Sequence, residues 1–253
     1  DFLLTWAPDA RTNDMRAAAV AICDRHTGVG ADGWILVTPP AQETNASIRL
    51  FNSDGSDAEI SGNGTRCAAA FLVETGFGGD AVRIQTGAGP KELRVLERDD
   101  YKFVFEMNMG AATIREENVR FPLTLTSGVQ EVTIIDVGNP QCAVFVDDFS
   151  FDWRSMGREI ESHAHFPNRT NVSFVRPVND HTIDVRFYER GAGETMSSGT
   201  GSTGAVAAAI VRGLVSSPVR VLTPAGPLEL RRDGTNLFLT GPAEIVAKGE
   251  FYL

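Results

Sequence analysis

Cysteine is scarce in this chain. Only Cys23, Cys67 and Cys142 occur among its 253 residues. Three scattered cysteines are too few for a disulfide framework or for a zinc cluster, which needs closely spaced ligands. We therefore expect a protein of the reducing cytoplasm.

The chain also lacks long apolar runs and an excess of positive charge. No stretch of about 18 apolar residues is present, so we expect no membrane-spanning segment, and no secretory signal is visible. The chain has 23 Lys and Arg against 33 Asp and Glu, a formal net charge of −10, which disfavours nucleic acid and anionic membranes as partners. Its length leaves room for two domains.

What the chain does contain is an internal repeat. Residues 61–64 (SGNG) and 198–201 (SGTG) are 137 residues apart. The same offset relates the segments RLFN and RFYE, at 49–52 and 186–189, and the segments TGAGPKELR and TPAGPLELR, at 86–94 and 223–231. One constant offset over three separated motifs indicates a duplicated unit. A site made by two such halves can present one equivalent group to each face of a ligand.

Each half is predicted to combine short strands with one long helix. The helices, over residues 65–74 and 202–212, are rich in alanine, apolar almost all round and closed by Gly76 and Gly213, which is typical of helices buried on every side. Short apolar runs bounded by turn residues predict the strands. These lie at 34–37, 48–51, 81–85, 93–96 and 103–107 in the first half, and at 132–136, 183–188, 219–222, 228–231 and 237–240 in the second.

The expected fold class is α+β. Two pseudo-symmetric halves, residues 1–115 and 116–253, would each form a barrel-like curved β-sheet around a central helix. A final strand over 244–253 could cross back to the first half.

The two repeated turns have a composition suited to binding an anion. Glycines let a ligand approach the backbone, and the first N–H groups and the dipole of a following helix favour a carboxylate or phosphate. The alternative is that Ser61 and Ser198 are simply helix N-caps. Glu189 and Arg190 follow a strand end, which suits recognition of a zwitterion, although a surface ion pair is the alternative.

Five segments in order resemble the diaminopimelate epimerase family, and the resemblance runs from Asp1 to the C-terminus. The segments are CDRHTGVGADG at 23–33, FNSDGS at 51–56, SGNGTRC at 61–67, VGNP at 137–140 and ERGAGET at 189–195. The resemblance implies two pseudo-symmetric halves with a site between them, and no metal, pyridoxal phosphate or other cofactor. It also implies inversion at the α-carbon of a small amino acid, LL- to meso-diaminopimelate, on the route to lysine and peptidoglycan. A homodimer is compatible with it.

The resemblance also implies the site residues. Members of this family use two cysteines, one removing the α-proton and the other delivering one to the opposite face, and Ser61 and Ser198 stand at these positions. Substrate contacts would fall on the side chains of Asn52, Asn63, Asn139, Asn171, Glu189 and Arg190. The backbone amides of Gly62, Asn63, Gly199 and Thr200 would hold the α-carboxylate.

Three departures from the family pattern bear on activity. Both catalytic thiols are replaced by hydroxyls, the family's histidine after Gly-Asn-Pro is Gln141, and the asparagine before the first Asp-Phe is not within the chain. An alcohol is a far weaker acid than a thiol and acts as a base only when a neighbour takes its proton. The sequence shows no such neighbour, and Cys67 and Cys142 are expected in the core.

Three interpretations therefore stay open. The serines are engineered replacements in an epimerase, or the chain is a natural serine-type paralogue that acts on another amino acid or epimerises slowly. In the third interpretation it is a non-catalytic protein that binds an amino acid in the retained pocket.

Overall fold

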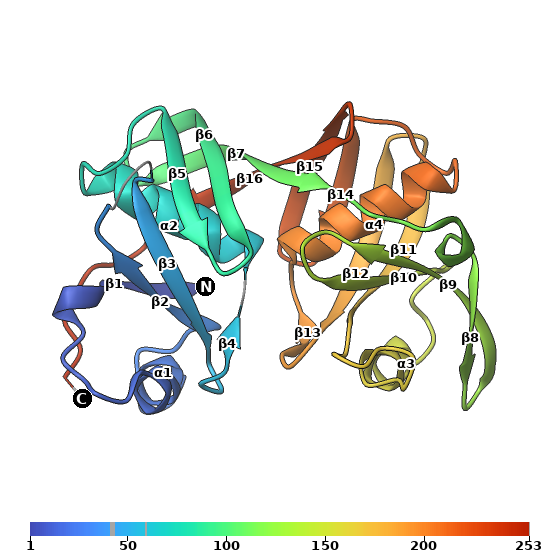
Figure 1. Ribbon diagram of the computed structural model, residues 1–253, viewed down its shortest axis with the longest axis horizontal. Helices are drawn as coiled ribbons and strands as arrows, with labels where there is room; N and C mark the ends of the chain where they lie inside the picture. Colours follow the sequence, from blue (N-terminus) through green and yellow to red (C-terminus); the bar gives the residue numbers. More distant parts are fainter. Residues whose placement is uncertain (41–43, 59, 253) are drawn as a thin grey trace. The chain divides into compact units, whose positions relative to one another are not determined.

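The chain folds into two compact units. The computed structural model describes residues 1–40, 44–58 and 60–252. Unit 1 comprises Asp1–Met107 and Gly241–Leu253, and unit 2 comprises Asn108–Thr240. The chain enters unit 2 within β7 (Lys102–Ala111) and returns within β16 (Asn236–Glu244) (Figure 1). The sequence led us to place one division at residues 115/116. Both crossings lie inside strands, so no loop marks them.

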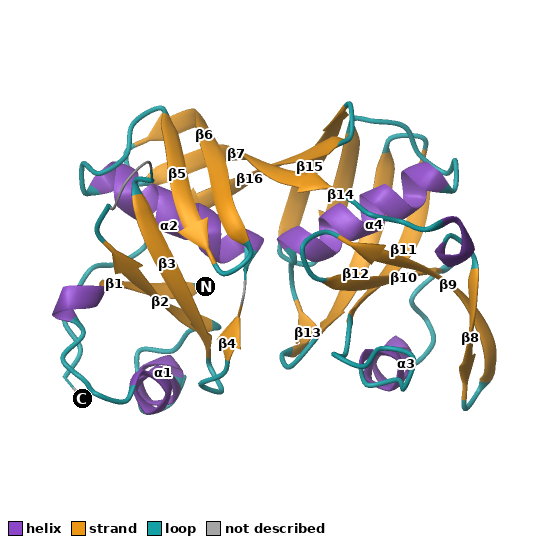
Figure 2. Ribbon diagram, in the orientation of Figure 1, coloured by secondary structure: helices purple, strands orange, loops and turns teal. Residues whose placement is uncertain are grey.

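In unit 1 a curved sheet surrounds helix α2 (Gly62–Glu74). The strands lie in the order β1-β2-β3-β5-β6-β7, and β4 pairs with β3. Their bounds are β1 (Phe2–Trp6), β2 (Gly33–Thr38), β3 (Ala46–Asn52), β4 (Asp57–Ala58), β5 (Ala81–Thr86) and β6 (Gly89–Asp99). Helix α2 contacts β1, β2, β3 and β5, and α1 (Met15–Cys23) packs on β2 and β3 (Figure 2).

In unit 2 a second curved sheet surrounds helix α4 (Gly199–Val211). The strands lie in the order β16-β15-β14-β12-β11-β10-β9-β8, and β13 pairs with β12. Their bounds are β8 (Phe121–Leu125), β9 (Gly128–Asp136), β10 (Pro140–Phe145), β11 (Asn171–Asn179), β12 (Thr182–Glu189), β13 (Gly193–Thr195), β14 (Val219–Thr223) and β15 (Gly226–Asp233). Helix α4 contacts β9, β10, β11, β12, β14 and β15, and α3 (Trp153–Glu161) packs on β11 and β12.

The two units repeat one topology, as the constant sequence offset predicts. In unit 1 the pairs β1–β2 and β3–β5 are parallel, and in unit 2 the corresponding pairs β10–β11 and β12–β14 are parallel. The helices α1 and α3 occupy equivalent places on the outside of the two sheets. This is the predicted α+β fold of two pseudo-symmetric halves.

The central helices differ in burial and begin earlier than predicted. Every residue of α4 from Gly199 to Ala209 is buried, whereas Asn63, Cys67 and Phe71 on α2 are half-buried. Each helix starts directly after its serine, three residues before the predicted start. The glycines therefore lie within the first helical turn and do not precede it.

Two sequence expectations need correction. Residues 245–252 form no strand, and Leu253 lies outside the described residues, so β16 ending at Glu244 takes the place of the predicted strand over 244–253. The backbone N–H of Ile245 donates to the carbonyl of Tyr101 at 3.0 Å, after which the chain leaves the sheet. The sequence did not predict the helices α1 and α3, nor the strands β1, β4, β11 and β13.

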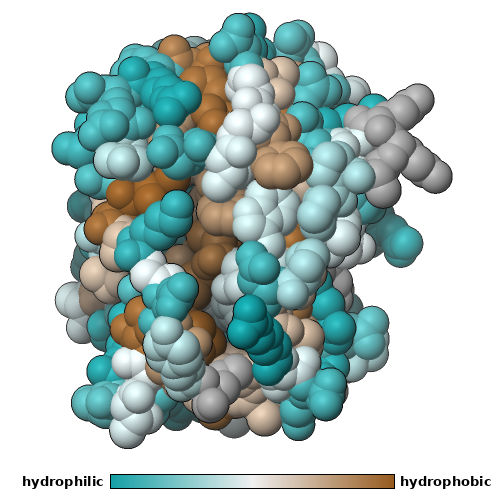
Figure 3. Space-filling view, turned by 90° about the vertical axis from the view of Figure 1, so that its left-hand side faces the viewer, coloured by the Kyte–Doolittle hydropathy of each residue, from teal (hydrophilic) through white to brown (hydrophobic). Residues whose placement is uncertain are grey.

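Part of the surface of unit 1 is apolar. Figure 3 shows a band of hydrophobic surface flanked by hydrophilic side chains, and exposed apolar residues of this unit include Val29, Phe77 and Val246. Within the described residues, no helix is long and apolar enough to cross a membrane. The homodimer stays a prediction.

Candidate functional site

Both repeated serines cap a central helix. The Oγ of Ser61 accepts a hydrogen bond from the N–H of Gly64 at 3.1 Å, and the Oγ of Ser198 accepts one from the N–H of Gly201 at 3.0 Å. Ser61 and Ser198 have extended backbones with φ of −131° and −137°, which is normal for an N-cap. The prediction that both serines are helix N-caps is therefore confirmed.

Each capping serine satisfies one N–H of its helix. Each serine side chain satisfies the third N–H of its helix, and the first two N–H groups of any α-helix have no acceptor within it. In α2 these belong to Gly62 and Asn63, and in α4 to Gly199 and Thr200. With the partial positive charge of a helix N-terminus, each turn is suited to a carboxylate.

The hydroxyl of Ser198 has a carboxylate partner. Its Oγ donates to Oε1 of Glu189 at 2.6 Å, and the hydroxyl of Thr195 donates to Oε2 of the same carboxylate at 2.7 Å. Ser198 is only 4% exposed, so this short hydrogen bond is protected from water. The sequence showed no neighbour for the hydroxyl of either serine, and the structure shows that the carboxylate of Glu189 accepts a hydrogen bond from Ser198.

The path of the chain explains this contact. Strand β12 ends at Glu189, and the backbone reverses through Gly191 and Gly193, which have φ of 77° and 74°. Strand β13 then pairs back on β12, with Thr195 opposite Phe187. Ser198, the N-cap of α4, follows three residues after Thr195 and is thereby returned to the end of the strand that carries Glu189.

The hydroxyl of Ser61 has a different neighbourhood. The offset that relates Ser198 to Ser61 relates Glu189 to Asn52. The Nδ2 of Asn52 donates to Oγ of Ser56 at 2.9 Å. Among residues 1–40, 44–58 and 60–252, no carboxylate accepts a hydrogen bond from Ser61. The two serines are thus equivalent in backbone but not in chemistry.

Gln141 orients Asn139 in unit 2. The Nε2 of Gln141 donates to Oδ1 of Asn139 at 2.8 Å, and Nδ2 of Asn139 makes a long contact of 3.5 Å with the hydroxyl of Thr200. Gln141 is 2% exposed, and its Oε1 has no partner within the described part of the chain. An amide cannot exchange a proton as the family's histidine can, so Gln141 positions Asn139 and does not titrate.

Asn171 joins three elements of unit 2. Its Nδ2 donates to the carbonyl of Pro140 at 3.0 Å, and its Oδ1 accepts from the backbone N–H of Arg190 at 3.0 Å. The guanidinium of Arg190 donates to the carbonyl of Asn168 at 3.3 Å. The hydrogen bonds of the buried Asn171 therefore hold the ends of β10, β11 and β12 together. A direct role in binding stays a prediction.

The predicted site residues thus divide between the two units. Unit 2 brings together the residues on its strand ends and on the first turn of α4, namely Asn139, Asn171, Glu189, Arg190, Ser198, Gly199 and Thr200. Unit 1 carries Asn52 at the end of β3, and Ser61, Gly62 and Asn63 at the start of α2. Thr195 and Gln141 complete the set in unit 2, although sequence reasoning gave neither a binding role.

None of the cysteines offers a replacement thiolate. Burial raises the pKa of Cys23 to about 11, with a further contribution from Asp32, and burial also raises the pKa of Cys67 and of Cys142. Cys23 and Cys142 are in the core, whereas Cys67 is half-buried. All three are protonated at neutral pH.

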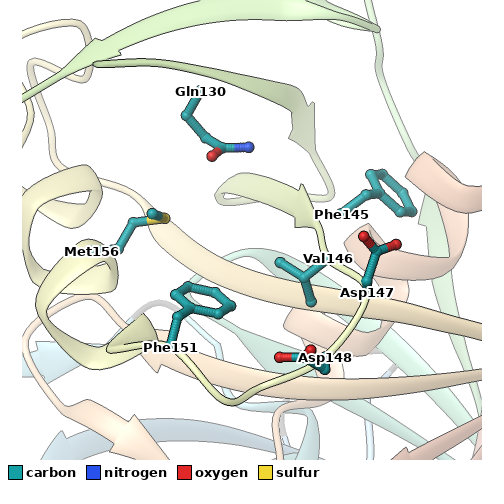
Figure 4. Close-up of a pocket in the computed structure, with 7 residues that line it drawn as sticks. All are labelled: Gln130, Phe145, Val146, Asp147, Asp148, Phe151 and Met156. Atoms are coloured by element: carbon teal, nitrogen blue, oxygen red, sulfur yellow. The ribbon is translucent and has the colours of Figure 1, made fainter. Parts of the chain in front are cut away.

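A separate pocket in unit 2 has the wrong charge for a carboxylate. Its volume is about 340 Å³, and the residues that line it are Gln130, Phe145, Val146, Asp147, Asp148, Phe151 and Met156 (Figure 4). Hydrogen bonds from the hydroxyl and N–H of Ser150 lower the pKa of Asp148, so the pocket carries negative charge. It contains none of the predicted site residues.

The described residues also include no cluster of His, Cys, Asp and Glu that could hold a metal ion.

The two first turns differ in packing, which gives a prediction about stability. A Cβ added at Gly201 would lie 2.8 Å from Phe187 and 2.9 Å from Oγ of Ser198, whereas at the equivalent Gly64 the nearest atom, in Ile35, would be 3.1 Å away. We expect Gly201→Ala to lower the free energy of unfolding by about 1–3 kcal/mol through overpacking. Gly64→Ala should change it by less than about 1 kcal/mol, because alanine favours the helix. Urea unfolding of both variants measures the difference, and equal losses would contradict this account of α4.

Comparison with known proteins supplies the family. The model of the family described as diaminopimelate epimerase matches residues 4–115 and 133–246. A diaminopimelate epimerase of Pelotomaculum thermopropionicum is 36% identical over 266 residues, covering 99% of this chain and 95% of that protein. One of Synechococcus elongatus is 38% identical over 253 residues, covering 93% and 88%.

Solved structures share the fold at lower identity. A hydroxyproline epimerase from Agrobacterium vitis, with bound trans-4-hydroxy-L-proline, superposes with a TM-score of 0.71 at 16% identity, covering 91% of this chain and 78% of that one. A methylitaconate-Δ-isomerase superposes with a TM-score of 0.63 at 17% identity, covering 97% and 90%. At this low sequence identity the superposition shows a shared fold and nothing about function.

Proposed function

Because this chain belongs to the diaminopimelate epimerase family, we propose that it binds a small α-amino acid and exchanges the proton on its α-carbon. Diaminopimelate is the first candidate substrate. The observation that carries the proposal is the 2.6 Å hydrogen bond from Ser198 to Glu189. It supplies a serine in a family site with a group that can take its proton.

Ser198 would act as the base of the reaction. The α-C–H bond breaks and its proton moves to Oγ of Ser198, while the hydroxyl's own proton moves to Oε1 of Glu189. The electron pair stays on the α-carbon. An adjacent base is the general way in which a weakly acidic hydroxyl becomes reactive. The N–H of Gly201, 3.0 Å from Oγ, fixes the orientation of the hydroxyl.

Ser61 would act on the opposite face as the proton donor. Its O–H bond breaks as the proton passes to the α-carbon, and the oxygen that remains is stabilised by the N-terminus of α2. Asn52, which corresponds to Glu189, is an amide and cannot accept a proton. Ser198 is therefore better suited to removing the α-proton and Ser61 to delivering one. Inversion by these two hydroxyls should be slower than inversion by the two thiols of the family.

The remaining predicted residues would bind the ligand. We assign the α-carboxylate to the first-turn amides of Gly62, Asn63, Gly199 and Thr200. Polar groups further along the substrate would meet the residues at the ends of β3, β10, β11 and β12. Those residues are Asn52, Asn139, Asn171, Glu189 and Arg190.

Binding without turnover is the second candidate function. This function is favoured because, among the described residues, no carboxylate accepts a hydrogen bond from the hydroxyl of Ser61. Such a protein would keep the ligand contacts and exchange no proton.

Hydrogen–deuterium exchange separates these functions. We expect the protein in D₂O to replace the α-proton of LL- or meso-diaminopimelate with deuterium, which is measured as loss of the α-proton NMR signal. A panel of other amino acids, including proline and lysine, tests the substrate, and calorimetry measures binding of each. If the protein binds an amino acid of the panel but exchanges the α-proton of none, the second function is established. If the protein binds none of these amino acids and exchanges the α-proton of none, the proposal is overturned.

A further inference from the structure

A buried carboxylate stands at the end of the outer helix of unit 2. Glu161 is the last residue of α3 and is only 2% exposed. Burial of a carboxylate costs free energy, and the partial negative charge at the C-terminus of a helix adds to this cost. The contacts that offset the cost therefore indicate what a glutamate does in this place.

The carboxylate of Glu161 joins two other segments of unit 2. Its Oε1 accepts a hydrogen bond from the backbone N–H of Gly191 at 3.3 Å, and its Oε2 accepts one from Nη2 of Arg169. Arg169 has a φ of 59°, a left-handed conformation that residues other than glycine seldom adopt. The guanidinium neutralises the buried carboxylate on one oxygen, and the other oxygen holds the N–H of Gly191.

Gly191 lies in the chain reversal on which the contact between Ser198 and Glu189 depends. It has a φ of 77° and stands between β12 and β13. The N–H of the preceding residue, Arg190, donates to Oδ1 of Asn171 at 3.0 Å. Two consecutive N–H groups of the reversal thus donate to side chains of other segments. Such hydrogen bonds fix the place of the reversal on unit 2, which bonds within the turn cannot do.

From this arrangement we infer that Glu161 is a positioning residue for the Ser198–Glu189 pair. Its carboxylate, neutralised by Arg169, holds the reversal at Gly191 and thereby sets the distance between the serine hydroxyl and Oε1 of Glu189. The effect on proton exchange rests on the proposed function, whereas the effect on the geometry of the pair does not. The reaction would then depend on α3, a helix that carries none of the predicted site residues.

Unit 1 has a different arrangement at the equivalent position. The 137-residue offset relates Glu161 to Asp24, the C-cap of α1. The Oδ1 of Asp24 accepts hydrogen bonds from the backbone N–H groups of His26 and Thr27, at 2.8 and 2.6 Å, and so stabilises its own loop. The contact of Glu161 with the reversal thus occurs in the unit whose serine donates to a carboxylate, as expected if it serves that pair.

A second glutamate on α3 serves as a matched control. The carboxylate of Glu159 accepts hydrogen bonds from the N–H and the hydroxyl of Thr126, at 2.6 and 3.0 Å. Thr126 follows β8, which ends at Leu125, and is not part of the reversal. Glu159→Gln therefore makes the same chemical change on the same helix and alters a bonded carboxylate, but not the one that holds Gly191.

The first test compares Glu161→Gln with Glu159→Gln. The NH₂ group of glutamine cannot accept a hydrogen bond, so the change at Glu161 keeps at most one of the two contacts. With diaminopimelate in D₂O, or with the amino acid that the wild-type protein exchanges, we expect Glu161→Gln to slow α-proton exchange about tenfold or more, because small displacements of reacting groups cost rate steeply. Kd, measured by calorimetry, should rise by a smaller factor, and Glu159→Gln should change neither quantity. Loss of folded protein alone would lower the rate and the number of binding sites by the same factor.

Arg169→Gly tests the other half of the ion pair. It removes the guanidinium and keeps the backbone, because a φ of 59° suits glycine. We expect this variant to slow exchange as well. The double variant with Glu161→Gln should be no slower than Glu161→Gln alone, since both residues act through the contact with Gly191. A double variant whose loss equals the product of the two single losses would contradict that shared contact and overturn the inference.

A further readout needs no ligand. In ¹⁵N-labelled protein the backbone amide resonances of Gly191 and Gly201 report the reversal and the serine, because the N–H of Gly201 donates to Oγ of Ser198 at 3.0 Å. Both resonances should shift in Glu161→Gln and in Arg169→Gly, and both should stay in place in Glu159→Gln.

The outcomes separate this inference from the proposed function. If the wild-type protein exchanges no α-proton, the proposed function fails, and the amide shifts still decide whether Glu161 acts on Ser198. A shift of Gly191 without a shift of Gly201 would show a contact that stabilises the turn alone and would overturn the inference. An unchanged exchange rate in Glu161→Gln beside an exchanging wild type would overturn it too. If Glu161→Gln does not fold, Arg169→Gly decides by both measurements.

Discussion

Glu189→Gln is expected to lower the rate of α-proton exchange by about 10²-fold or more, which is the usual contribution of a positioned acid–base group. Glutamine keeps the shape of the side chain and an oxygen that can accept from Ser198, but it cannot take the proton. The NMR exchange measurement in D₂O gives the rate. Binding of the amino acid, measured by calorimetry, should fall far less than the rate.

The neighbouring carboxylate of Glu194 provides the control. It forms an exposed ion pair with Arg154, with N–O distances of 2.6 and 2.8 Å, and it does not touch Ser198. Glu194→Gln makes the same chemical change on the adjoining strand and should leave exchange within about twofold, since such surface pairs contribute at most about 1 kcal/mol. Equal rates in Glu189→Gln and the wild-type protein would refute the proton-relay role of Glu189.

The sequence was sufficient to predict the architecture of the fold. The alanine-rich central helices and the constant 137-residue offset predicted two repeated units. The strand order in the structure repeats in the same way around α2 and α4. The helices α1 and α3 were missed, although Asp14 and Asp152 cap them through their side chains. Their short length and mixed composition gave no long apolar pattern.

The central contact of the site could not be read from the sequence. Glu189 and Ser198 were both identified, but the hydrogen bond between them depends on a chain reversal at Gly191 and Gly193. Turn residues predict that the chain reverses, and they do not predict which side chains meet after the reversal. The same limit applies to Glu161, whose contact with Gly191 joins residues 30 positions apart.

Replacing both serines together, Ser61→Cys with Ser198→Cys, is expected to raise the epimerisation rate of diaminopimelate by about 10²- to 10⁴-fold, the range for a well-matched acid–base group. A thiol has an ordinary pKa of about 8.5 and a lower one at a helix N-terminus or beside a cation. A thiolate is therefore accessible at neutral pH, whereas the hydroxyl of Ser198 must first pass its proton to Glu189. Epimerisation of a single stereoisomer, followed by chromatography, measures the gain.

The single substitutions should not be equivalent. A thiol at position 61 lies at the N-terminus of α2 near the guanidinium of Arg66, which favours the thiolate. A thiol at position 198 lies beside the carboxylate of Glu189, 2.6 Å from the present hydroxyl, which favours the protonated form. We therefore expect Ser61→Cys alone to supply a base and to give the larger gain in exchange of the two single variants.

The pattern across the three variants tests the asymmetry of the two turns. If the double variant gains activity and the single variants contribute equally, the charges of Arg66 and Glu189 have no influence on the direction of proton transfer.

If no variant gains activity while the amino acid still binds, the ligand contacts have diverged from those of the curated epimerases. Gln141 is then the residue to test next, because it stands where the family has a titrating histidine. Gln141→His in the double variant would then restore a proton acceptor beside Asn139, 2.8 Å from the present amide.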